Sequence, residues 1–508
     1  MRSVLGPLRR SVRARRAAGV SLVALALAVT AACGGSAMSP GEVRAANEAV
    51  AGTNNNASGG GDGGTGGTGG TGTVDPGTGT GGTGGSGTTP GSGNTPGATG
   101  GGGGGTGTGG GGTGGTGGGG GGGGGGSVPG VKAGSCAGFQ NQKGITNSTI
   151  TIGNSSDISG PVPGLFTGAQ QATKAYVEYF NRTSSICGRK LQLVTYDSKT
   201  DAGADQQAYT KLCDGVFAAV GSMSAFDSGG APTAQACGLP DIRTAAVTLA
   251  RNECTTCFGV QATGKGEYQN EVYDYWRRTN KAATEKAAFL YLNAGAAAEN
   301  ARTQMAVGRK RGMNWVYTAA IDVAAFNYGP YVQQMKSKGV QFVQFLGAYQ
   351  QSARLAQAMQ AGGFKPAVLM YDPSIYEPGF IKQGGSATDG AKFFVNFTPL
   401  YEHQPELDLY KKWLQQVAPG AQPTFFGLFA WSATKLFVEK SIQLGGRLNR
   451  ASLVSAVHGT NGWTGGGSHA PMSVGSKHPP TCVRWMQVKG GTFTSLTPKY
   501  ICGAYTKA

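Results

Sequence analysis

The hydrophobic and polar positions that follow the glycine-rich part of the chain predict a strand, a helix and a second strand. Residues 150–157 begin with alternating β-branched residues, which is typical of a strand. Gly, Pro and Ser dominate residues 158–167, which predicts a loop. Within residues 168–181 the apolar positions recur at helical spacing. One face of this predicted helix carries Ala169, Ala172, Tyr176, Val177 and Phe180. With a strand at 191–197, this order predicts a parallel sheet whose strand ends carry a ligand-accepting loop.

The same alternation continues in two series along the rest of the chain. The first series contains a helix, a buried strand and two loops, at residues 202–213, 216–220, 221–230 and 244–248. The second series has predicted strands at 287–292, 315–318, 340–346 and 367–371. Its predicted helices are 267–280, 299–310, 328–338 and 352–361. Helices at 404–417 and 425–444 and short strands at 482–488 and 492–494 follow. Two series of similar size predict an α/β protein with two lobes, each built on a mostly parallel sheet.

The N-terminal residues predict export from the cytoplasm. Several arginines precede a short apolar stretch, 17–32, that ends at Cys33, so residues 1–32 are expected to be a signal peptide. The stretch is too short for a convincing membrane span. Residues 30–33, Thr-Ala-Ala-Cys, resemble the lipobox of bacterial lipoproteins, which implies that Cys33 is acylated and anchors the protein to the membrane. An ordinary cleaved signal is the alternative, and the export route stays open.

Residues 33–135 predict a linker between the anchor and the folded domain. From about residue 52 to residue 130 they are almost entirely Gly and Thr, with occasional Ser, Pro and Asn. Such a composition cannot bury a core, so the segment is expected to be disordered. Its obvious use is a tether between a lipid-anchored Cys33 and the domain. A low-complexity expansion whose length has no role is the alternative.

The chain of 508 residues carries a formal charge of +17. A basic domain can attract anionic surfaces or ligands over long range. However, its Lys and Arg residues are scattered rather than grouped, and exported proteins have little access to nucleic acid. Ordinary surface charge is therefore the preferred interpretation, and no nucleic-acid partner is expected.

Eight cysteines follow Cys33, and an even number in an exported protein predicts disulfides. Cys482 with Cys502, which flank a predicted hairpin, and Cys213 with Cys237 are the expected pairs. The other candidates are Cys136, Cys187, Cys254 and Cys257. The last two form a Cys-x-x-Cys motif that could serve redox or metal chemistry. Because the motif lacks a strand-then-helix setting and the four histidines are not at ligand spacing, a structural role is favoured and no metal is expected.

Enzyme motifs are missing from the sequence. It contains no Gly-x-Ser-x-Gly elbow, no His-Glu-x-x-His and no phosphate-binding glycine loop with a lysine. The poly-Gly run neither follows a strand nor opens a helix, so it is not a phosphate loop. A thiol oxidoreductase built on Cys254 and Cys257 is the remaining enzymatic alternative. We therefore expect a protein without catalytic activity and without a cofactor.

Several short stretches resemble the leucine/isoleucine/valine-binding type of ABC-transporter solute receptor. They include Ile-Ser-Gly-Pro at 158–161 and Phe-Thr-Gly-Ala-Gln at 166–170. The others lie at 180–181, 188–191, 196–197, 220–221, 238–240, 363–366 and 483–488. The resemblance covers roughly residues 144–503. It implies a type I periplasmic-binding fold with two Rossmann-like lobes, three crossovers and a ligand between the lobes. The lobes are expected at residues 136–265 with 402–465, and 266–401 with 466–508.

The resemblance also implies the residues of the ligand site. Relatives hold a ligand's carboxylate and part of its ammonium with two loops, which here supply Ser224, Asp227, Ser228, Ala246 and Thr248. The other lobe supplies an aromatic wall and an acidic partner for an ammonium, Tyr349 and Asp372. Helix N-termini at strand ends favour a carboxylate independently. For each position an ordinary loop residue is the alternative, and Asp227 could simply cap a helix.

One departure from the family concerns the ligand. The loop between Pro161 and Phe166 is shorter than in the amino-acid receptors and lacks an aromatic residue. Branched-chain amino acids are therefore not assured, and another amino acid, an amide, a urea-like molecule or an aromatic acid is an alternative.

Together these features predict a monomeric solute-binding lipoprotein on the outer face of the bacterial cell membrane. It would deliver a small polar ligand to an ABC permease. A ligand-sensing module coupled to a signalling partner and a structural cell-envelope protein are the alternatives.

Overall fold

A computed structural model of the chain describes residues 128–508. The predicted signal peptide, Cys33 and most of the predicted linker lie outside the described residues. Residues 128–135, which the sequence assigns to the linker, contact the folded domain. The backbone N–H of Gly134 donates to the carbonyl of Ile442 over 2.9 Å, and Gly446 donates to Ser135 over 2.7 Å. Val128 is buried. Residues 128–135 therefore pack with the folded domain, ahead of the predicted boundary.

The first sheet has five parallel strands in the order β2-β1-β3-β4-β5. Its strands are β1 (Thr149–Ser156), β2 (Lys190–Asp197), β3 (Ala218–Val220), β4 (Asp241–Ala246) and β5 (Cys257–Ala262). The helices that connect them are α2 (Thr167–Thr183), α3 (Ala202–Gly215), α4 (Ala231–Ala236) and α5 (Leu249–Glu253). All five apolar residues of the predicted face of α2 are buried, as expected. The apolar pattern therefore predicted which side of α2 enters the core.

The second sheet has eight strands. Seven of them follow the order β13-β12-β11-β10-β9-β7-β8, and the eighth, β14, pairs with β12. The parallel strands are β7 (Ala287–Leu292), β8 (Trp315–Ile321), β9 (Phe342–Leu346), β10 (Val368–Tyr371) and β11 (Lys392–Val395). The antiparallel strands are β12 (Cys482–Lys489), β13 (Thr492–Ser495) and β14 (Ile501–Cys502). Their helices are α6 (Glu271–Thr279), α7 (Lys281–Thr284), α8 (Gly295–Lys310), α9 (Gly329–Ser337), α10 (Tyr349–Ala361) and α11 (Pro378–Gly384).

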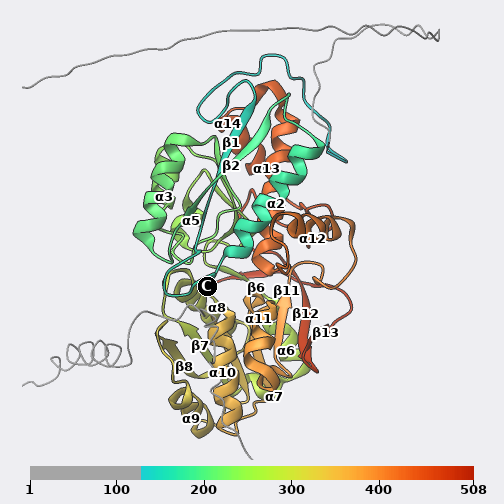
Figure 1. The fold of residues 1–508 in the computed structure, drawn as a ribbon. Helices are drawn as coiled ribbons and strands as arrows, with labels where there is room; N and C mark the ends of the chain where they lie inside the picture. Colours follow the sequence, from blue (N-terminus) through green and yellow to red (C-terminus); the bar gives the residue numbers. More distant parts are fainter. Residues whose placement is uncertain (1–127) are drawn as a thin grey trace, which may run out of the picture. The chain divides into compact units, whose positions relative to one another are not determined.

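Three passages of the chain connect the two sheets, and Figure 1 shows β1 and β2 of the first sheet above β7, β8, β11 and β12 of the second. The first follows β5, the second follows β11, and the third precedes β12. Between the second and third lie α12 (Pro405–Val417), α13 (Phe425–Leu444) and α14 (Arg450–His458). The long apolar helix α13 packs against α2 and β4. Short 3-10 turns complete the elements, at η1 (Pro373–Ile375), η2 (Gly385–Thr388) and η3 (Gly445–Arg447).

One predicted helix differs from the structure. Residues 267–280 were expected to be helical, but β6 (Glu267–Gln269) is a strand and only α6 continues as a helix. β6 pairs antiparallel with β15 (Tyr505–Lys507), which comes from the end of the chain. Backbone hydrogen bonds to so distant a segment override the local helical pattern.

Four disulfides join the described cysteines, and they include both expected pairs, Cys482–Cys502 and Cys213–Cys237. The other two are Cys136–Cys187 and Cys254–Cys257. A crosslink stabilises a fold chiefly by restricting the unfolded chain. Cys136–Cys187 therefore fixes the start of the ordered domain to the turn before β2. Within residues 128–508, helices long and apolar enough to cross a membrane are lacking.

Candidate functional site

A cavity of about 1200 Å³, counted with its opening to solvent, lies where loops of both sheets meet. The loops after β1, β2, β3 and β4 contribute Val162, Leu165, Phe166, Thr200, Met223, Ser224, Ala225 and Val247. The loops after β7, β8, β9 and β10 contribute Ala294, Val323, Gly347, Ala348, Asp372, Pro373 and Ser374. These segments follow the carboxyl ends of parallel strands, which is where α/β sheets bind ligands. The cavity therefore occupies the position predicted from the order of strands and helices.

Two of the predicted ligand residues line this cavity, one from each sheet: Ser224 after β3 and Asp372 after β10. The Ser224 side chain is buried, and its hydroxyl oxygen accepts a hydrogen bond from the Phe226 backbone N–H over 3.1 Å. The Asp372 carboxylate accepts the Ser374 backbone N–H over 3.2 Å and thereby caps η1.

The other predicted residues lie behind the lining rather than in it. Thr248 caps α5, because its hydroxyl oxygen accepts the Arg251 backbone N–H over 3.3 Å. The Ala246 carbonyl accepts the hydroxyl of Thr263 over 2.7 Å. Tyr349 is the first residue of α10, and its ring lies against Gly379. Ser228 is partly buried and, like Asp227, is not among the lining residues of the described chain.

The backbone N–H groups after β4 are bonded to acidic side chains of the protein itself. The Asp227 carboxylate accepts from Val247 over 2.9 Å and from Thr248 over 3.3 Å. The next N–H along the chain, that of Leu249, donates to the carboxylate of Glu299. Asp227 and Glu299 thus occupy the donors at the start of α5, where a bound anion would otherwise gain from the helix N-terminus.

Asp157 fixes three loops at the same edge of the first sheet. Its side chain is fully buried. One carboxyl oxygen accepts the Thr200 backbone N–H over 3.0 Å and the Ser198 hydroxyl, and the other accepts the Ala225 backbone N–H over 2.7 Å. Burial raises the pKa of Asp157, while these hydrogen bonds oppose that rise. The loops after β1, β2 and β3 therefore share one buried acceptor.

A buried network of charges holds the Asp227 loop from behind. The Arg251 side chain is fully buried and donates to the Asp227 carbonyl over 2.7 Å. The same guanidinium pairs with Asp241 over 2.9 Å and with Asp205 over 3.1 Å. Arg243 also pairs with Asp241, over 3.2 Å, so that two buried arginines face two buried aspartates. Because opposite charges are matched and hydrogen-bonded, this network tolerates burial.

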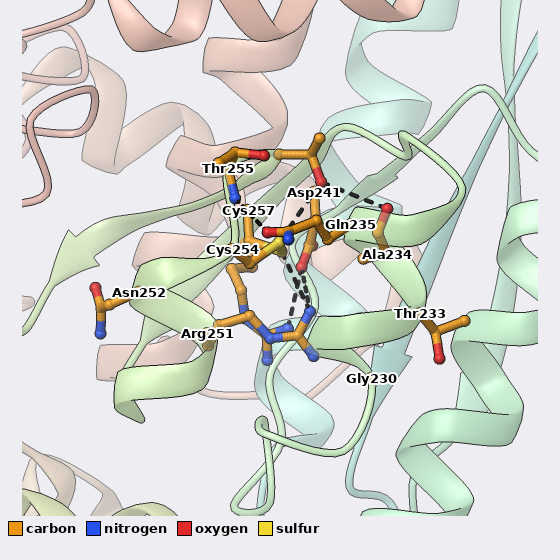
Figure 2. The surroundings of a disulfide bond; sticks show 12 residues. Gly230, Thr233, Ala234, Gln235, Asp241, Arg251, Asn252, Cys254, Thr255 and Cys257 are labelled. Carbon is orange, nitrogen blue, oxygen red and sulfur yellow. Dashed lines mark hydrogen bonds and ion pairs between the residues drawn. A yellow bond between two sulfur atoms is a disulfide. The ribbon is translucent and has the colours of Figure 1, made fainter.

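Figure 2 shows the Cys254–Cys257 disulfide beside this network, with Arg251 directed toward Asp241. One guanidinium nitrogen of Arg251 lies 3.7 Å from the sulfur of Cys257. The Lys477 ammonium donates to the Cys254 carbonyl over 2.6 Å. Both cysteines are buried and bonded to each other, away from the lining residues. This arrangement matches the structural role favoured from the sequence.

Apolar side chains make up most of the cavity wall. Phe166 and Phe426 lie with ring centroids 4.7 Å apart, and Phe425 lies 4.6 Å from Phe426. Further apolar residues of the wall are Val162, Leu165, Met223, Leu292, Leu346, Phe394, Pro479 and Pro480. Among the described residues that line the cavity, Asp372 is the only one with an acidic or basic side chain.

One polar group of the lining, the hydroxyl of Tyr268, was absent from the sequence-based site. Tyr268 in β6 lines the cavity and is only 6% exposed, yet its hydroxyl has no hydrogen-bond partner in the described part of the chain. Burial raises the pKa of this hydroxyl well above its usual value, and Tyr273 and the Asp372 carboxylate raise it further. Burial also raises the pKa of Asp372 to about 6. Tyr268 could not be assigned from sequence, because its segment was predicted to be helical.

Two hydrogen bonds join segments of the two sheets beside the cavity. Ala296, in the first turn of α8, donates its N–H to the carbonyl of Ala225 over 2.8 Å. The second is the contact between Leu249 and Glu299. Gly295 permits the approach, since a Cβ there would lie 2.2 Å from the Ala225 oxygen. These contacts pass directly between the two halves that line the cavity.

Comparison with known proteins gives consistent matches. A model of the periplasmic binding protein family matches residues 149–492. A leucine-binding protein from Thermotoga maritima aligns at 14% identity over 70% of this chain and 99% of its own, with a TM-score of 0.59. A branched-chain amino acid binding protein from Streptococcus pneumoniae, in complex with isoleucine, aligns at 15% identity over 70% of this chain and 100% of its own, with a TM-score of 0.59. A fatty acid ABC transporter substrate-binding protein from Thermomonospora curvata aligns at 18% identity over 72% of this chain and 95% of its own, with a TM-score of 0.63. No match was found among the curated proteins.

Proposed function

Because the chain belongs to the periplasmic binding protein family, we propose that it is an extracytoplasmic solute-binding lipoprotein that delivers a small organic solute to an ABC permease. Its two sheets form the type I periplasmic-binding fold expected from the sequence. The fold alone does not determine the solute, since similar folds serve different ligands. The proposal therefore depends on the site.

The observation that carries the proposal is the cavity shared by the two sheets. Loops from both sheets line it, while three passages of the chain connect the sheets. A protein of this design can open by a hinge and bury its solute on closing. Ser224 and Asp372 are the sequence-predicted residues that we propose contact the solute. Asp227, Ser228, Ala246, Thr248 and Tyr349 support the walls around it.

Membrane attachment is the second part of the proposal. The Thr-Ala-Ala-Cys sequence at 30–33 supports acylation of Cys33, and the Gly/Thr-rich segment after it supports a tether. A Cys33→Ser variant expressed in a bacterium that processes lipoproteins tests this part. We expect the native protein in the membrane fraction and the variant released from it. Equal distribution of the two proteins would contradict the anchor.

Solute binding is tested by thermal denaturation of the protein lacking residues 1–127, after exchange through denaturant to remove any carried solute. A solute that binds only the folded state raises the melting temperature. The panel contains amino acids, amides, fatty acids and aromatic acids. In a separate experiment, the protein is purified without exchange and then denatured, and mass spectrometry identifies any solute that co-purified with it. We expect at least one concentration-dependent shift. No shift and no co-purified solute would contradict the proposed function.

A further inference from the structure

Four backbone donors that could bind a carboxylate at the edge of the first sheet are already used. Asp227 accepts the backbone N–H groups of Val247 and Thr248, and Glu299 accepts that of Leu249. Asp157 accepts the N–H of Ala225, over 2.7 Å. A ligand carboxylate placed at this edge would have to displace an acidic side chain of the protein. It would also be repelled by that side chain.

Two backbone donors in the first turn of α8, on the second sheet, are also used. Its residue Ala296 donates to the carbonyl of Ala225, and Ala297 donates to Ala294 over 3.1 Å. A helix N-terminus attracts an anion through free N–H groups, and these two are bonded. The close approach at Gly295 also excludes a ligand group from this point, because the Ala225 oxygen lies only 2.2 Å from where a Cβ would be.

The charges in the cavity also disfavour an anion. Among its lining residues in the described chain there is no Lys, Arg or His, and Asp372 is acidic. A buried carboxylate without a positive partner pays a large desolvation cost. The electrostatics thus point away from a free acid and away from the carboxylate of an amino acid.

The same cavity does contain a place for a hydrogen-bonding head. The hydroxyl of Tyr268 is buried, lacks a partner among the described residues, and belongs to a side chain that lines the cavity. In the same lining, one oxygen of Asp372 accepts from Ser374, whereas the other has no donor within the described part. An unpaired buried hydroxyl is costly, so a ligand group that pairs with it is favoured. The Tyr268 hydroxyl can accept and donate a hydrogen bond, and the free Asp372 oxygen can accept one. A ligand N–H or O–H group suits these partners.

The remainder of the wall suits hydrocarbon. Phe166, Phe425 and Phe426 form one aromatic group, and Leu292, Leu346 and Phe394 lie on the second-sheet side. Apolar surface of a ligand gains free energy by leaving water for such a wall.

We infer that the solute has an apolar body and a hydrogen-bond-donating head without a free carboxylate, such as an amide, alcohol or amine, and that this head contacts Tyr268 and Asp372. This inference rests on the proposed function. In such a solute the apolar body would provide most of the binding free energy, and the hydrogen bonds of the head would orient it in the cavity.

Matched pairs of compounds test the inference by calorimetric titration at pH 7.5. Octanamide is compared with octanoate, and 3-phenylpropanamide with 3-phenylpropanoate, so that each pair shares one body. We expect each amide to bind at least about tenfold more tightly than its acid, because the acid adds a buried like charge. Equal or tighter binding of the acids, or tighter binding of free leucine than of both amides, would overturn the inference while leaving the proposed function intact.

Two variants separate a role in binding from a role in folding. Tyr268→Phe removes only the unpaired hydroxyl, so we expect an unchanged or higher melting temperature without solute and roughly three- to tenfold weaker amide binding. Tyr273→Phe is the control, because the Tyr273 hydroxyl donates to the Gln304 carbonyl over 3.0 Å and lies outside the cavity lining. It should lower the melting temperature without changing the affinity. Unchanged amide binding by Tyr268→Phe would overturn the assignment of the head.

The identity of a co-purified solute distinguishes failure of this inference from failure of the proposed function. A carboxylate-bearing solute would overturn the inference and support the proposed function. An apolar amide, alcohol or amine would support both. If no compound binds and no solute co-purifies, the proposed function fails, and the inference fails with it.

Discussion

Leu249 donates its backbone N–H to the carboxylate of Glu299, and this contact joins α5 of the first sheet to α8 of the second. The donor belongs to the first turn of α5, where N–H groups lack partners within the helix. A negative charge there is also favoured by the helix dipole. Glu299 therefore favours the arrangement in which the two halves are close.

Glu299→Ala removes this contact and is expected to weaken solute binding. One hydrogen bond to a charged group contributes about 1.5–3 kcal/mol, so the affinity should fall by roughly ten- to a hundredfold if the contact forms only on closure. Glu299→Gln retains an acceptor and should lose less. Calorimetric titration of both variants checks the order. Equal losses of affinity in the two variants would show that the hydrogen-bond acceptor at position 299 does not contribute to binding.

Gly295→Ala tests the close approach of α8 to the Ala225 loop. Gly295 has a φ of +42°, and an added Cβ would meet both the Ala225 oxygen at 2.2 Å and the Phe226 ring at 2.9 Å. We expect a lower melting temperature and a loss of solute affinity of at least about tenfold, since the strained backbone and the clash act together.

The matched control for this substitution is Gly363→Ala. Gly363 has a φ of +59° and open space where its Cβ would lie. It carries the backbone strain without the clash, so it should lower the melting temperature and leave the affinity unchanged. An equal loss of affinity in both variants would contradict a specific role for Gly295.

Asp227→Asn is expected to destabilise the loop after β4. The carboxylate accepts two backbone N–H groups, and an amide has only one oxygen to replace its two. The loss should be about 1–3 kcal/mol in the free energy of unfolding, measured by urea denaturation. Asp214→Asn, at an exposed position of α3, is the control and should change little. The Asp227 variant should also bind octanoate better than the native protein does, because a negative charge has been removed near the cavity.

Asp372 predicts a dependence of stability on pH. Burial raises the pKa of its carboxyl to about 6, whereas the unfolded chain has a value near 3.9. The folded state thus binds the proton more tightly, so the contribution of Asp372 to stability rises as the pH falls from 7 toward 4. Ser374 is hydrogen-bonded to this carboxyl, and Tyr268, which lines the same cavity, stays neutral over that range.

The difference between native protein and Asp372→Asn isolates this effect. Other groups titrate in the same window. For example, burial lowers the pKa of His469 to about 4, which reduces stability as the pH falls. We expect the variant to be the more stable of the two at pH 7.5 and the difference to shrink by pH 5. A difference that is constant with pH would show that Asp372 is not protonated in this range.

The sequence predicted the fold where local pattern and packing agree. The apolar face of α2 follows from helical spacing and is buried as expected, and α13 is a helix over the predicted residues 425–444. The β6–β15 pairing did not follow, because its hydrogen bonds join residues 267–269 to residues 505–507. No local pattern encodes a partner that far along the chain.

The site was predicted less well than the fold for a related reason. Sequence patterns located the loops after β3, β4 and β10, and two of their predicted residues, Ser224 and Asp372, line the cavity. They do not reveal that Glu299 would reach the first turn of α5. Nor do they show which N–H groups remain free, since that depends on side chains from separate elements. The unpaired hydroxyl of Tyr268 could be recognised only once its surroundings were known.

Hydrogen–deuterium exchange of the protein lacking residues 1–127, with and without octanamide, tests the central claim most directly. The account predicts slower exchange on both sides of the cavity, in residues 223–227 from the first sheet and residues 294–297 and 372–374 from the second. Protection confined to one half, or an exchange pattern unchanged by a solute that demonstrably binds, would contradict capture between the two halves.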